Sequence, residues 1–215
     1  MTSHDPTIMN LAKRYDTLAA DYDRRWRVYN RAVHDEVLRH LPCDMTDNRV
    51  LDIGCGTGAW LELLMRRHPQ IAHVVGVEPS REMLNQACER CTDFSSKIPV
   101  ELRQESAEDQ TFQDNSFDLV TCLNTLHYLE NAPQFFADTH RGLDANGTLI
   151  VQDYTHNGWP LFNVGARLFD DGCRHLYNAR ELNDLAQNAG FCVEYARTFR
   201  ITGFWRGVVL VATKS

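Results

Sequence analysis

The 215-residue sequence has no long apolar run and no excess of basic residues. No apolar stretch approaches the roughly 18 to 20 residues that a membrane-spanning helix needs, so we expect no stable membrane insertion. Lys and Arg together number 22 against 29 for Asp and Glu, which gives a formal net charge of −7. Nucleic-acid-binding proteins usually carry a basic face, so we expect no nucleic acid among the partners.

Two further patterns are missing. Residues 1–6 lack the basic-then-apolar order of a secretory leader. The seven cysteines are scattered and odd in number, which favours reduced thiols over a disulfide framework and predicts a cytoplasmic protein. The one C-x-x-C pair, Cys88 and Cys91, has neither a second pair nor suitably spaced histidines. Zinc needs about four ligands, so no metal site is predicted.

Short β-branched runs alternate with amphipathic stretches along most of the chain. Helical spacing predicts two N-terminal helices, over residues 8–22 and 29–41, the second ending at Pro42. Seven strands are predicted over residues 49–53, 74–77, 100–103, 117–123, 148–153, 192–200 and 207–213. Further helices are predicted over residues 58–67, 82–91, 133–142 and 179–190. This alternation indicates an α/β fold with a mostly parallel sheet and an antiparallel pair at one edge.

The first predicted strand ends in a loop of three alternating glycines, Gly54, Gly56 and Gly58. In a parallel sheet, ligands bind beyond the carboxyl ends of the strands, near the point where the strand order reverses. Glycines there let the backbone turn sharply and approach a ligand closely. With Ala59 the run also satisfies the loose dinucleotide pattern G-x-G-x-x-G/A, so the glycines alone admit two nucleotide cofactors.

Two carboxylates near this loop bear on the choice of cofactor. Asp52 lies beside the glycines, where it would repel a pyrophosphate at the helix N-terminus but attract a cationic ligand. S-adenosylmethionine carries an ammonium and a sulfonium and has no phosphate. Glu78, at the end of the second strand, can accept hydrogen bonds from both hydroxyls of a ribose. Both cofactors contain such a ribose, so Glu78 supports a nucleotide site and Asp52 favours S-adenosylmethionine.

Residues 50–58, 74–80 and 117–120 together resemble the class I S-adenosylmethionine-dependent methyltransferases. Within that class, the chain resembles the branch related to quinone biosynthesis, often called methyltransferase type 11. Residues 15–23, YDTLAADYD, are similar to the Y-D-x-x-A-x-x-Y-D opening of that branch. The resemblance implies a Rossmann-like, doubly wound, seven-stranded fold in one domain, residues 1–215. Residues 1–44 would form an N-terminal helical cap, 45–155 the cofactor-binding core, and 156–215 a lid segment and the C-terminal strands.

Together with the residues above, the resemblance implies a set of cofactor-binding residues: Tyr15, Tyr22, Asp52, Gly54, Cys55, Gly56, Glu78, Pro79, Met83, Ser106, Ala107, Glu108, Leu123 and Asn124. Tyr15 and Tyr22 share one helical face, so packing in the core and closing over the cofactor are both open for them. In this set Asp52 would organise the ammonium end, Glu78 would hold the ribose and Met83 would pack on the adenine. Ser106 stands where the family often has Asp, so the backbone of Ala107 is expected to read the adenine edge.

The candidate catalytic residues are His127, Tyr128 and Asp153, of which the resemblance bears on His127 and Tyr128. Residues 126–129 resemble the family's L-H-H-L segment, with Tyr128 in place of the second His. This position lies near the reacting methyl group, where an aromatic wall and an acid–base role are both open. His156 and His175 are further candidates for a general base, which is needed only if the acceptor loses a proton during attack.

Residues 154–177 are too apolar for an idle loop, because they include Trp159, Leu161, Phe162, Val164, Leu168 and Phe169. Their place over the carboxyl ends of the strands suggests a lid. This predicts a small-molecule methyl acceptor, hydrophobic or aromatic, methylated by in-line displacement. The apolar face could instead complete the core or the interface of a homodimer. Two other functions stay open: an NAD-dependent oxidoreductase and a non-catalytic S-adenosylmethionine-binding protein.

Overall fold

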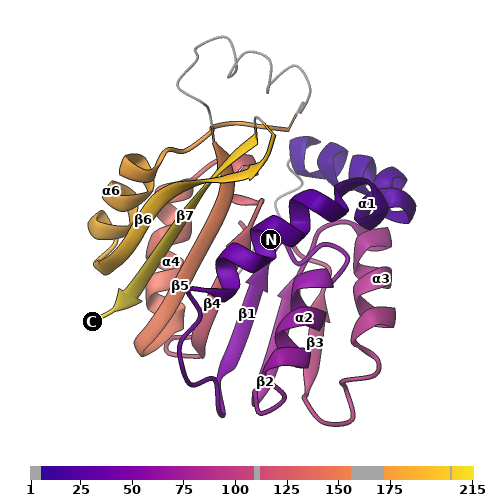
Figure 1. Cartoon of the computed structure of the whole chain (residues 1–215), viewed down its shortest axis with the longest axis horizontal. Coiled ribbons are helices and arrows are strands. Elements are labelled where there is room, and N and C mark those ends of the chain that lie inside the picture. The colour runs from indigo at the N-terminus through magenta and orange to yellow at the C-terminus, as the bar shows by residue number, and fades with distance from the viewer. Residues whose placement is uncertain (1–5, 109–111, 156–171, 204) are drawn as a thin grey trace.

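A computed structural model describes residues 6–108, 112–155, 172–203 and 205–215 of the chain. Within these residues, seven strands form one sheet in the order β3-β2-β1-β4-β5-β7-β6 (Figure 1). The strands are β1 (Arg49–Ile53), β2 (His73–Val77), β3 (Val100–Arg103), β4 (Phe117–Leu123), β5 (Leu143–Thr155), β6 (Phe191–Thr202) and β7 (Trp205–Lys214). The first five pair in parallel, and β7 lies antiparallel between β5 and β6. The predicted sheet, mostly parallel with an antiparallel edge pair, is confirmed.

The strand order reverses between β1 and β4. The chain runs outward from β1 through β2 to β3 on one side, and from β4 to β5 on the other. The connections after β1 and β4 therefore leave the sheet in opposite directions. Their divergence opens a crevice at the carboxyl ends of these two strands.

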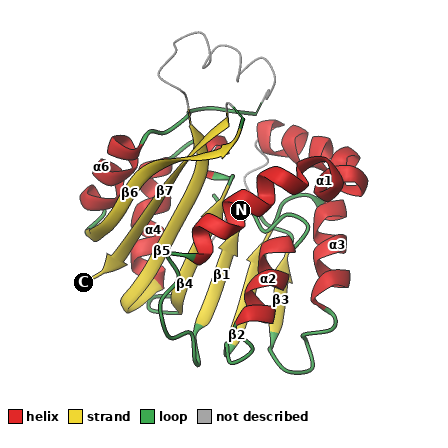
Figure 2. Ribbon diagram, viewed as in Figure 1, coloured by secondary structure: helices red, strands yellow, loops and turns green. Residues whose placement is uncertain are grey.

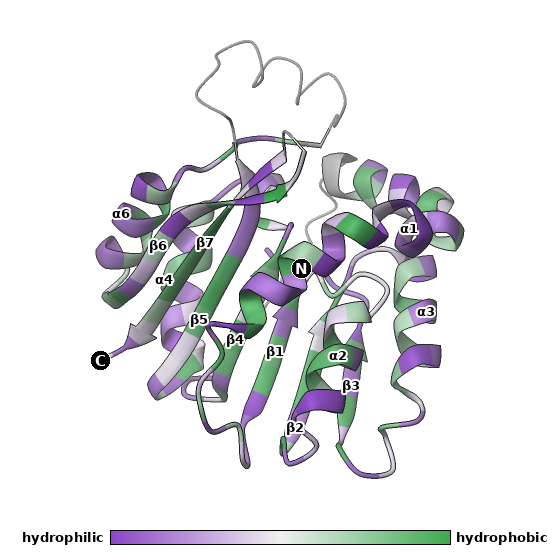
Figure 3. Cartoon of the chain, in the orientation of Figure 1, coloured by the Kyte–Doolittle hydropathy of each residue, from purple (hydrophilic) through white to green (hydrophobic). Residues whose placement is uncertain are grey.

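Helices cover both faces of the sheet, so the protein has three layers (Figure 2). The regular helices after the first are α2 (Ala59–Arg67), α3 (Arg81–Cys91), α4 (Ala132–Gly142) and α6 (Ala179–Asn188), and η1 (Leu126–Tyr128) is a short 3-10 turn. Trp60 and Leu61 of α2 belong to the buried cluster on one face, whereas Phe136 of α4 and Leu182 of α6 belong to the cluster on the other. The central strands are predominantly hydrophobic along their length (Figure 3), as burial on both faces requires.

The N-terminal segment forms one helix, α1 (Pro6–Leu38), which ends before Pro42. The prediction of two separate helices was wrong, because residues 23–28 are helical as well. They contain neither Gly nor Pro, and Trp26 packs edge-to-face on Tyr29 and Trp205 with ring centroids 5.7 and 6.5 Å apart. Nothing in this stretch therefore interrupts the helix. The first half of α1 contacts the loops at the carboxyl ends of the strands, and Val33 and Val37 of its second half pack into the core.

Helix starts follow the capping pattern of the sequence. The spacing of Asn178 and Glu181 predicts a capping box, and α6 has one: the Asn178 side chain accepts from the Glu181 N–H, and the Glu181 carboxylate accepts from the Asn178 N–H. Ser80 caps α3 by accepting from the Met83 N–H. The Ser80 cap lies three residues after the end of β2 and begins α3.

Asp118 ties the amino ends of β1 and β4 together. Its carboxylate accepts from the Arg49 backbone N–H at 2.7 Å and from the guanidinium at 3.0 and 3.1 Å. Burial acts to raise the pKa of Asp118, but the hydrogen bonds and charge of Arg49 outweigh it and hold that pKa below its ordinary value. Asp118 therefore has a structural role, at the end of the sheet opposite the crevice. None of the helices in the described residues has the length and apolar character that crossing a bilayer requires.

Candidate functional site

A cavity lies at the carboxyl ends of β1, β2 and β4, covered by α1. All the residues predicted to bind the cofactor line it: Tyr15, Tyr22, Asp52, Gly54, Cys55, Gly56, Glu78, Pro79, Met83, Ser106, Ala107, Glu108, Leu123 and Asn124. Sequence reasoning therefore brought together residues from five separate segments. That each of them binds the cofactor stays a prediction.

The glycine loop after β1 forms the floor of the cavity. The N–H groups of Gly54 and Cys55 both donate to the carbonyl of Val77, at 2.9 and 3.0 Å, and so fix the loop to β2. Gly54 has φ +75°, and a Cβ on it would lie 2.1 Å from the Thr125 hydroxyl oxygen. Gly56 has φ +53°, and a Cβ on it would meet nothing within 4 Å. The positive φ favours glycine at both positions. At position 54 the contact with Thr125 also requires it, whereas Gly56 leaves open space beside the backbone for a ligand.

Asp52, the residue before the last of β1, is a buried carboxylate that lines the cavity and is only 2% exposed. It accepts a hydrogen bond from the Thr121 hydroxyl at 2.7 Å, and Thr121 in turn accepts from the Trp60 indole at 3.3 Å. Burial raises the pKa of Asp52 to about 7, although the Thr121 hydrogen bond acts to lower it. A bound cation would stabilise the ionised form and offset the cost of burying this charge.

Glu78 connects three parts of the site. One carboxylate oxygen accepts from the Gly56 N–H at 3.1 Å, and the other accepts from the Ser80 N–H at 2.9 Å. Burial raises its pKa to about 7, these two hydrogen bonds act to lower it, and the charge of Asp52 acts to raise it. Glu78 thus stabilises the glycine loop and the start of α3, and each oxygen keeps a second lone pair for a ligand hydroxyl.

The cavity wall beyond β2 comes from α3 and from the loop after β3. Met83 is 1% exposed and contributes both to the packing of α3 and to the cavity lining. Ser106 is buried and lines the cavity with Ala107 and Glu108. The Glu108 carboxylate accepts a hydrogen bond from the Glu130 N–H, which joins this loop to the segment after η1.

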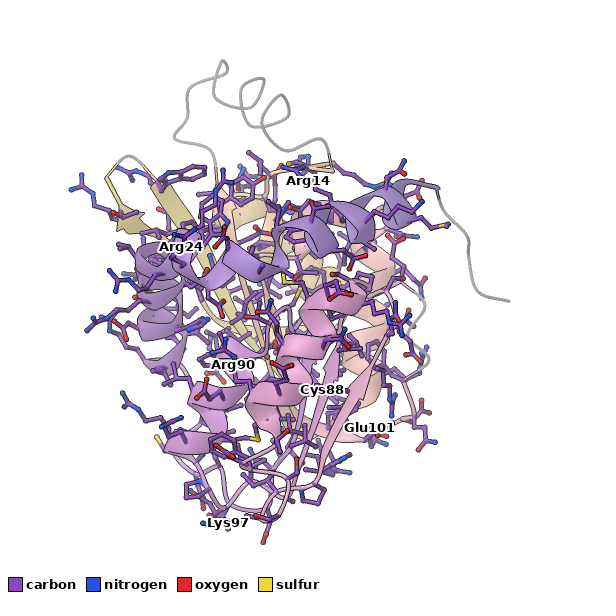
Figure 4. All side chains as sticks on the ribbon, turned by 90° about the vertical axis from the view of Figure 1, so that its right-hand side faces the viewer. Arg14, Arg24, Cys88, Arg90, Lys97 and Glu101 are labelled. Carbon is purple, nitrogen blue, oxygen red and sulfur yellow. The ribbon has the colours of Figure 1, made fainter. Side chains whose placement is uncertain are left out.

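Two acidic residues of α1 hold the helix over the cavity, and the sequence reasoning assigned them no role. Asp16 accepts from the Ser80 hydroxyl at 2.6 Å and from the Glu82 N–H at 3.1 Å. Asp23 accepts from the Thr57 hydroxyl at 2.8 Å and forms an ion pair with Arg90 of α3. Arg90 is labelled in Figure 4, on the side of the molecule where α1 and α3 meet. In each of the two Tyr-Asp dipeptides of α1, the tyrosine therefore lines the cavity and the aspartate binds a segment that adjoins it.

We expect Asp23→Asn to destabilise the protein by about 1 kcal/mol, because the half-buried Arg90 loses one of its two charged partners and keeps only Glu62. Asp21→Asn is the matched control, since Asp21 pairs with Arg24 on the exposed side of the same helix. Urea denaturation of both variants measures the change in the free energy of unfolding. A loss for Asp23→Asn no larger than that for Asp21→Asn would show that the Asp23–Arg90 pair does not hold α1 in place.

His127 and Asp153 form a buried pair behind the cavity wall. Asp153 accepts from the His127 backbone N–H at 2.9 Å and lies 2.7 Å from its Nδ1. Neither residue lines the cavity, whereas Tyr128 does, and its ring stacks on His127 with centroids 3.8 Å apart. The Tyr128 hydroxyl lies 2.7 Å from that of Tyr15, so the two tyrosines join η1 to α1 across the cavity. A catalytic role for His127, Tyr128 and Asp153 stays a prediction.

Several residues singled out in the sequence lie elsewhere. The apolar residues of the expected lid, Trp159, Leu161, Phe162, Val164, Leu168 and Phe169, and the base candidate His156 lie outside the described residues. His175 does not line the cavity and pairs with Glu181 at 3.2 Å. Cys88 is exposed and Cys91 is buried. In the part of the chain that the structure describes, no group of three or more His, Cys, Asp or Glu side chains could hold a metal ion.

The structure adds lining residues that the sequence did not indicate. Asn30 and His34 reach the cavity from the second half of α1, and Trp60 reaches it from the first turn of α2. The only signal for the first two was that they lie four residues apart, on one face of a helix. That spacing does not say which cavity the face meets, so these residues could not be found without the fold.

The lining residues fit S-adenosylmethionine better than a dinucleotide. Two buried carboxylates, Asp52 and Glu78, line the cavity in the described residues, and no Lys or Arg does. A pyrophosphate would meet only negative charge there, whereas a ligand with an ammonium and a sulfonium would be attracted. The open side of Gly56 provides room beside the backbone. Asp52 and the loop would hold the methionine part of the cofactor, Glu78 the ribose, and Met83 with Ala107 the adenine.

The chain is similar to known methyltransferases. The model of the family described as "Methyltransferase domain" matches residues 22–196. A demethylmenaquinone methyltransferase from Lactiplantibacillus plantarum is 26% identical over 207 residues, which cover 85% of this chain and 87% of that protein. A Haemophilus influenzae protein is 33% identical over 129 residues, and this match covers 56% of this chain and about half, 48%, of that protein.

The fold is shared with solved methyltransferase structures. The geranyl diphosphate C-methyltransferase of Streptomyces coelicolor, solved with Mg²⁺, geranyl diphosphate and S-adenosyl-L-homocysteine, superposes with a TM-score of 0.73 at 16% identity. The superposition covers 86% of this chain and 79% of that one. On the match of the family model, the chain belongs to the methyltransferase domain family, as a class I S-adenosylmethionine-dependent methyltransferase of the quinone-biosynthesis-like branch.

Proposed function

We propose that the protein transfers the methyl group of S-adenosylmethionine to a small hydrophobic or aromatic acceptor. The observation that carries this proposal is a continuous series of aromatic rings beside the cofactor cavity. In order of contact the rings are Tyr22, Tyr15, Tyr128, His127, Tyr154, Trp205 and Tyr29, with successive centroids 3.8 to 6.1 Å apart. Tyr15, Tyr22 and Tyr128 lie at the cavity itself.

Such a wall selects an apolar acceptor. Aromatic side chains offer a large contact area with little loss of conformational freedom, and they exclude water from the acceptor. Two similar proteins carry names that agree with this choice, a demethylmenaquinone methyltransferase and a geranyl diphosphate C-methyltransferase. Both named substrates contain a large apolar part, which supports the same acceptor class here.

The chemistry of transfer requires mainly positioning. Bound S-adenosylmethionine supplies a methyl group on a sulfonium, which is already activated for an in-line displacement. The tyrosines of α1 and η1 would hold the acceptor close to that methyl group and in line with the breaking bond. Their ring faces would also stabilise a nearby cation by about 0.5 to 2 kcal/mol.

His127 and Asp153 can handle a proton if the acceptor is a hydroxyl or an aromatic carbon. The Asp153 carboxylate favours a proton on Nδ1 of His127, which makes Nε2 the basic nitrogen. The acceptor proton would pass towards this nitrogen, and Asp153 would stabilise the imidazolium that forms. For an acceptor that loses no proton, the same rings would act only as a wall.

Binding and turnover test the proposal together. We expect S-adenosyl-L-homocysteine to stabilise the protein in a thermal-shift assay and NAD to have no effect. With S-adenosylmethionine present, a naphthoquinol or a phenol should give S-adenosyl-L-homocysteine faster than a polar amine acceptor does. Stabilisation by NAD alone would overturn the assignment of the cofactor. Binding of S-adenosyl-L-homocysteine without turnover of any apolar acceptor would indicate a non-catalytic protein.

A further inference from the structure

Asn30 and His34 form a polar patch on an otherwise apolar stretch of α1. They are four residues apart, so their side chains lie one above the other on the same face of the helix. Both line the cofactor cavity. Their neighbours on the helix, Val33 and Val37, are fully buried in the core. A helix that packs its apolar side on the sheet thus turns an amide and an imidazole towards the site.

His34 is held in a defined position. Its ring lies on the indole of Trp60, with centroids 5.5 Å apart and an angle of 49° between the planes. Burial lowers the pKa of His34 to about 4, although the charges of Asp23 and Asp35 act to raise it. The imidazole is therefore neutral in the ligand-free protein at physiological pH and offers one N–H donor.

Charge distinguishes this end of the cavity. Among the residues that line it in the described part of the chain, His34 is the only basic side chain, whereas Asp52, Glu78 and Glu108 are acidic. S-adenosylmethionine carries one carboxylate, which Asp52 and Glu78 would repel elsewhere in the site. We therefore expect an anionic group to bind at His34, because the lining carboxylates would repel it in the rest of the cavity.

The order of the lining residues points to the same place. Pro79 and Met83 stand at the β2 and α3 side, followed by Ser106 and Ala107 after β3, where the adenine would bind. With the ribose at Glu78, the methionine part extends the other way, past Asp52. That direction leads to the first turn of α2 and to the second half of α1, which pack together in the core.

We propose that Asn30 and His34 bind the carboxylate of the methionine part of S-adenosylmethionine. This inference rests on the proposed function, because it assumes that cofactor. The amide of Asn30 and one imidazole N–H of His34 would donate to the two carboxylate oxygens. Hydrogen bonds to an ionised acceptor are about twice as strong as neutral ones, so these two residues would select for the amino-acid end of the cofactor.

Calorimetry with two ligands tests the proposal without any measurement of activity. S-adenosyl-L-homocysteine contains the carboxylate, and 5′-methylthioadenosine lacks it but keeps the adenine and ribose. His34→Phe keeps a ring against Trp60 and removes the N–H donors, and Asn30→Leu removes the amide. Each variant should weaken the binding of S-adenosyl-L-homocysteine about tenfold to a hundredfold. It should change the affinity for 5′-methylthioadenosine by less than about twofold. His40→Phe is the matched control, because His40 packs on Tyr195 outside the cavity.

The possible results separate the two proposals. Unchanged affinity of both variants for S-adenosyl-L-homocysteine would overturn the carboxylate site. Equal weakening of both ligands would also overturn it, since the residues would then only shape the cavity. Failure of the unaltered protein to bind either ligand would refute the proposed function instead. If His34→Phe does not fold, Asn30→Leu alone decides the question.

Discussion

Asp52→Asn is expected to stabilise the ligand-free protein above pH 7 and to weaken its binding of the cofactor. The carboxylate is buried, and its charged form is compensated only by the Thr121 hydroxyl. Asn has the same shape and can still accept that hydrogen bond. The substitution therefore removes an unfavourable buried charge and changes little else in the ligand-free site.

The sign and size of the expected change in the free energy of unfolding follow from the pKa of Asp52. Burial raises it from 3.8 to about 7 in the folded protein. Between these values the folded state binds more protons than the unfolded state, so the contribution of Asp52 to stability falls as the pH rises and levels off above about 7. Since one pH unit corresponds to about 1.4 kcal/mol, the full difference is about 4 kcal/mol. We expect Asp52→Asn to recover about 2 to 4 kcal/mol at pH 8 and less at pH 5.

Urea denaturation of the ligand-free proteins at both pH values measures this effect. Asp118→Asn is the control of opposite sign, because Arg49 holds the pKa of Asp118 below its ordinary value and the charged form stabilises the fold. It should lower the free energy of unfolding at pH 8. Destabilisation of the protein by Asp52→Asn at pH 8 would contradict the prediction, since the charge of Asp52 would then be favourable in the absence of a ligand.

Asp52→Asn should lower the affinity for the cofactor, although it stabilises the ligand-free protein. A neutral Asn cannot offer a charged partner to an ammonium, so S-adenosyl-L-homocysteine should bind about tenfold to a hundredfold more weakly. A carboxylate that destabilises the ligand-free protein and strengthens ligand binding is typical of a functional site. An Asp52→Asn protein with unchanged affinity would remove Asp52 from the set of cofactor-binding residues.

Local signals in the sequence were sufficient to predict the sheet and the floor of the site. The β-branched runs predicted all seven strands. The signal is clearest in β1, β2 and β4, because strands buried on both faces need continuous apolar sequence. The glycine loop and Glu78 were found because their backbone and charge requirements fall within a few residues of a strand end. Gly54 also has a long-range requirement that these local signals do not show. The glycine is required by Thr125, which lies 71 residues further along the chain but 2.1 Å from the position that a Cβ would take.

Residues on α1 were harder to interpret, because helical spacing shows which residues share a face but not what that face meets. Tyr15 and Tyr22 share one helical face, but the sequence left open whether they pack in the core or close over the cofactor. Asp16 and Asp23 had no predicted role, since their partners, Ser80 and Thr57, come from distant loops. Trp26, in the stretch that joins the two predicted helices, contacts Trp205, and this contact exists only in the folded protein.

Glu78→Gln is expected to weaken every ligand that contains the ribose. A Gln side chain keeps one acceptor oxygen, but its amide nitrogen can only donate. It would therefore face either the Gly56 N–H or the Ser80 N–H, both of which need an acceptor. The unsatisfied N–H offsets the benefit of removing a buried charge, so a gain in stability like that of Asp52→Asn is not expected.

The affinity for S-adenosyl-L-homocysteine should fall about 30-fold to 100-fold in Glu78→Gln, because both the ribose contact and the glycine loop are affected. The affinity for 5′-methylthioadenosine should fall by the same factor, whereas His34→Phe should weaken the binding of S-adenosyl-L-homocysteine alone. Glu62→Gln is the matched control: Glu62 pairs with Arg66 and Arg90 and does not line the cavity. Calorimetry with both ligands distinguishes the outcomes. If Glu78→Gln weakened S-adenosyl-L-homocysteine alone, the ribose would not lie at Glu78, and the order of the whole cofactor along the cavity would have to be reversed.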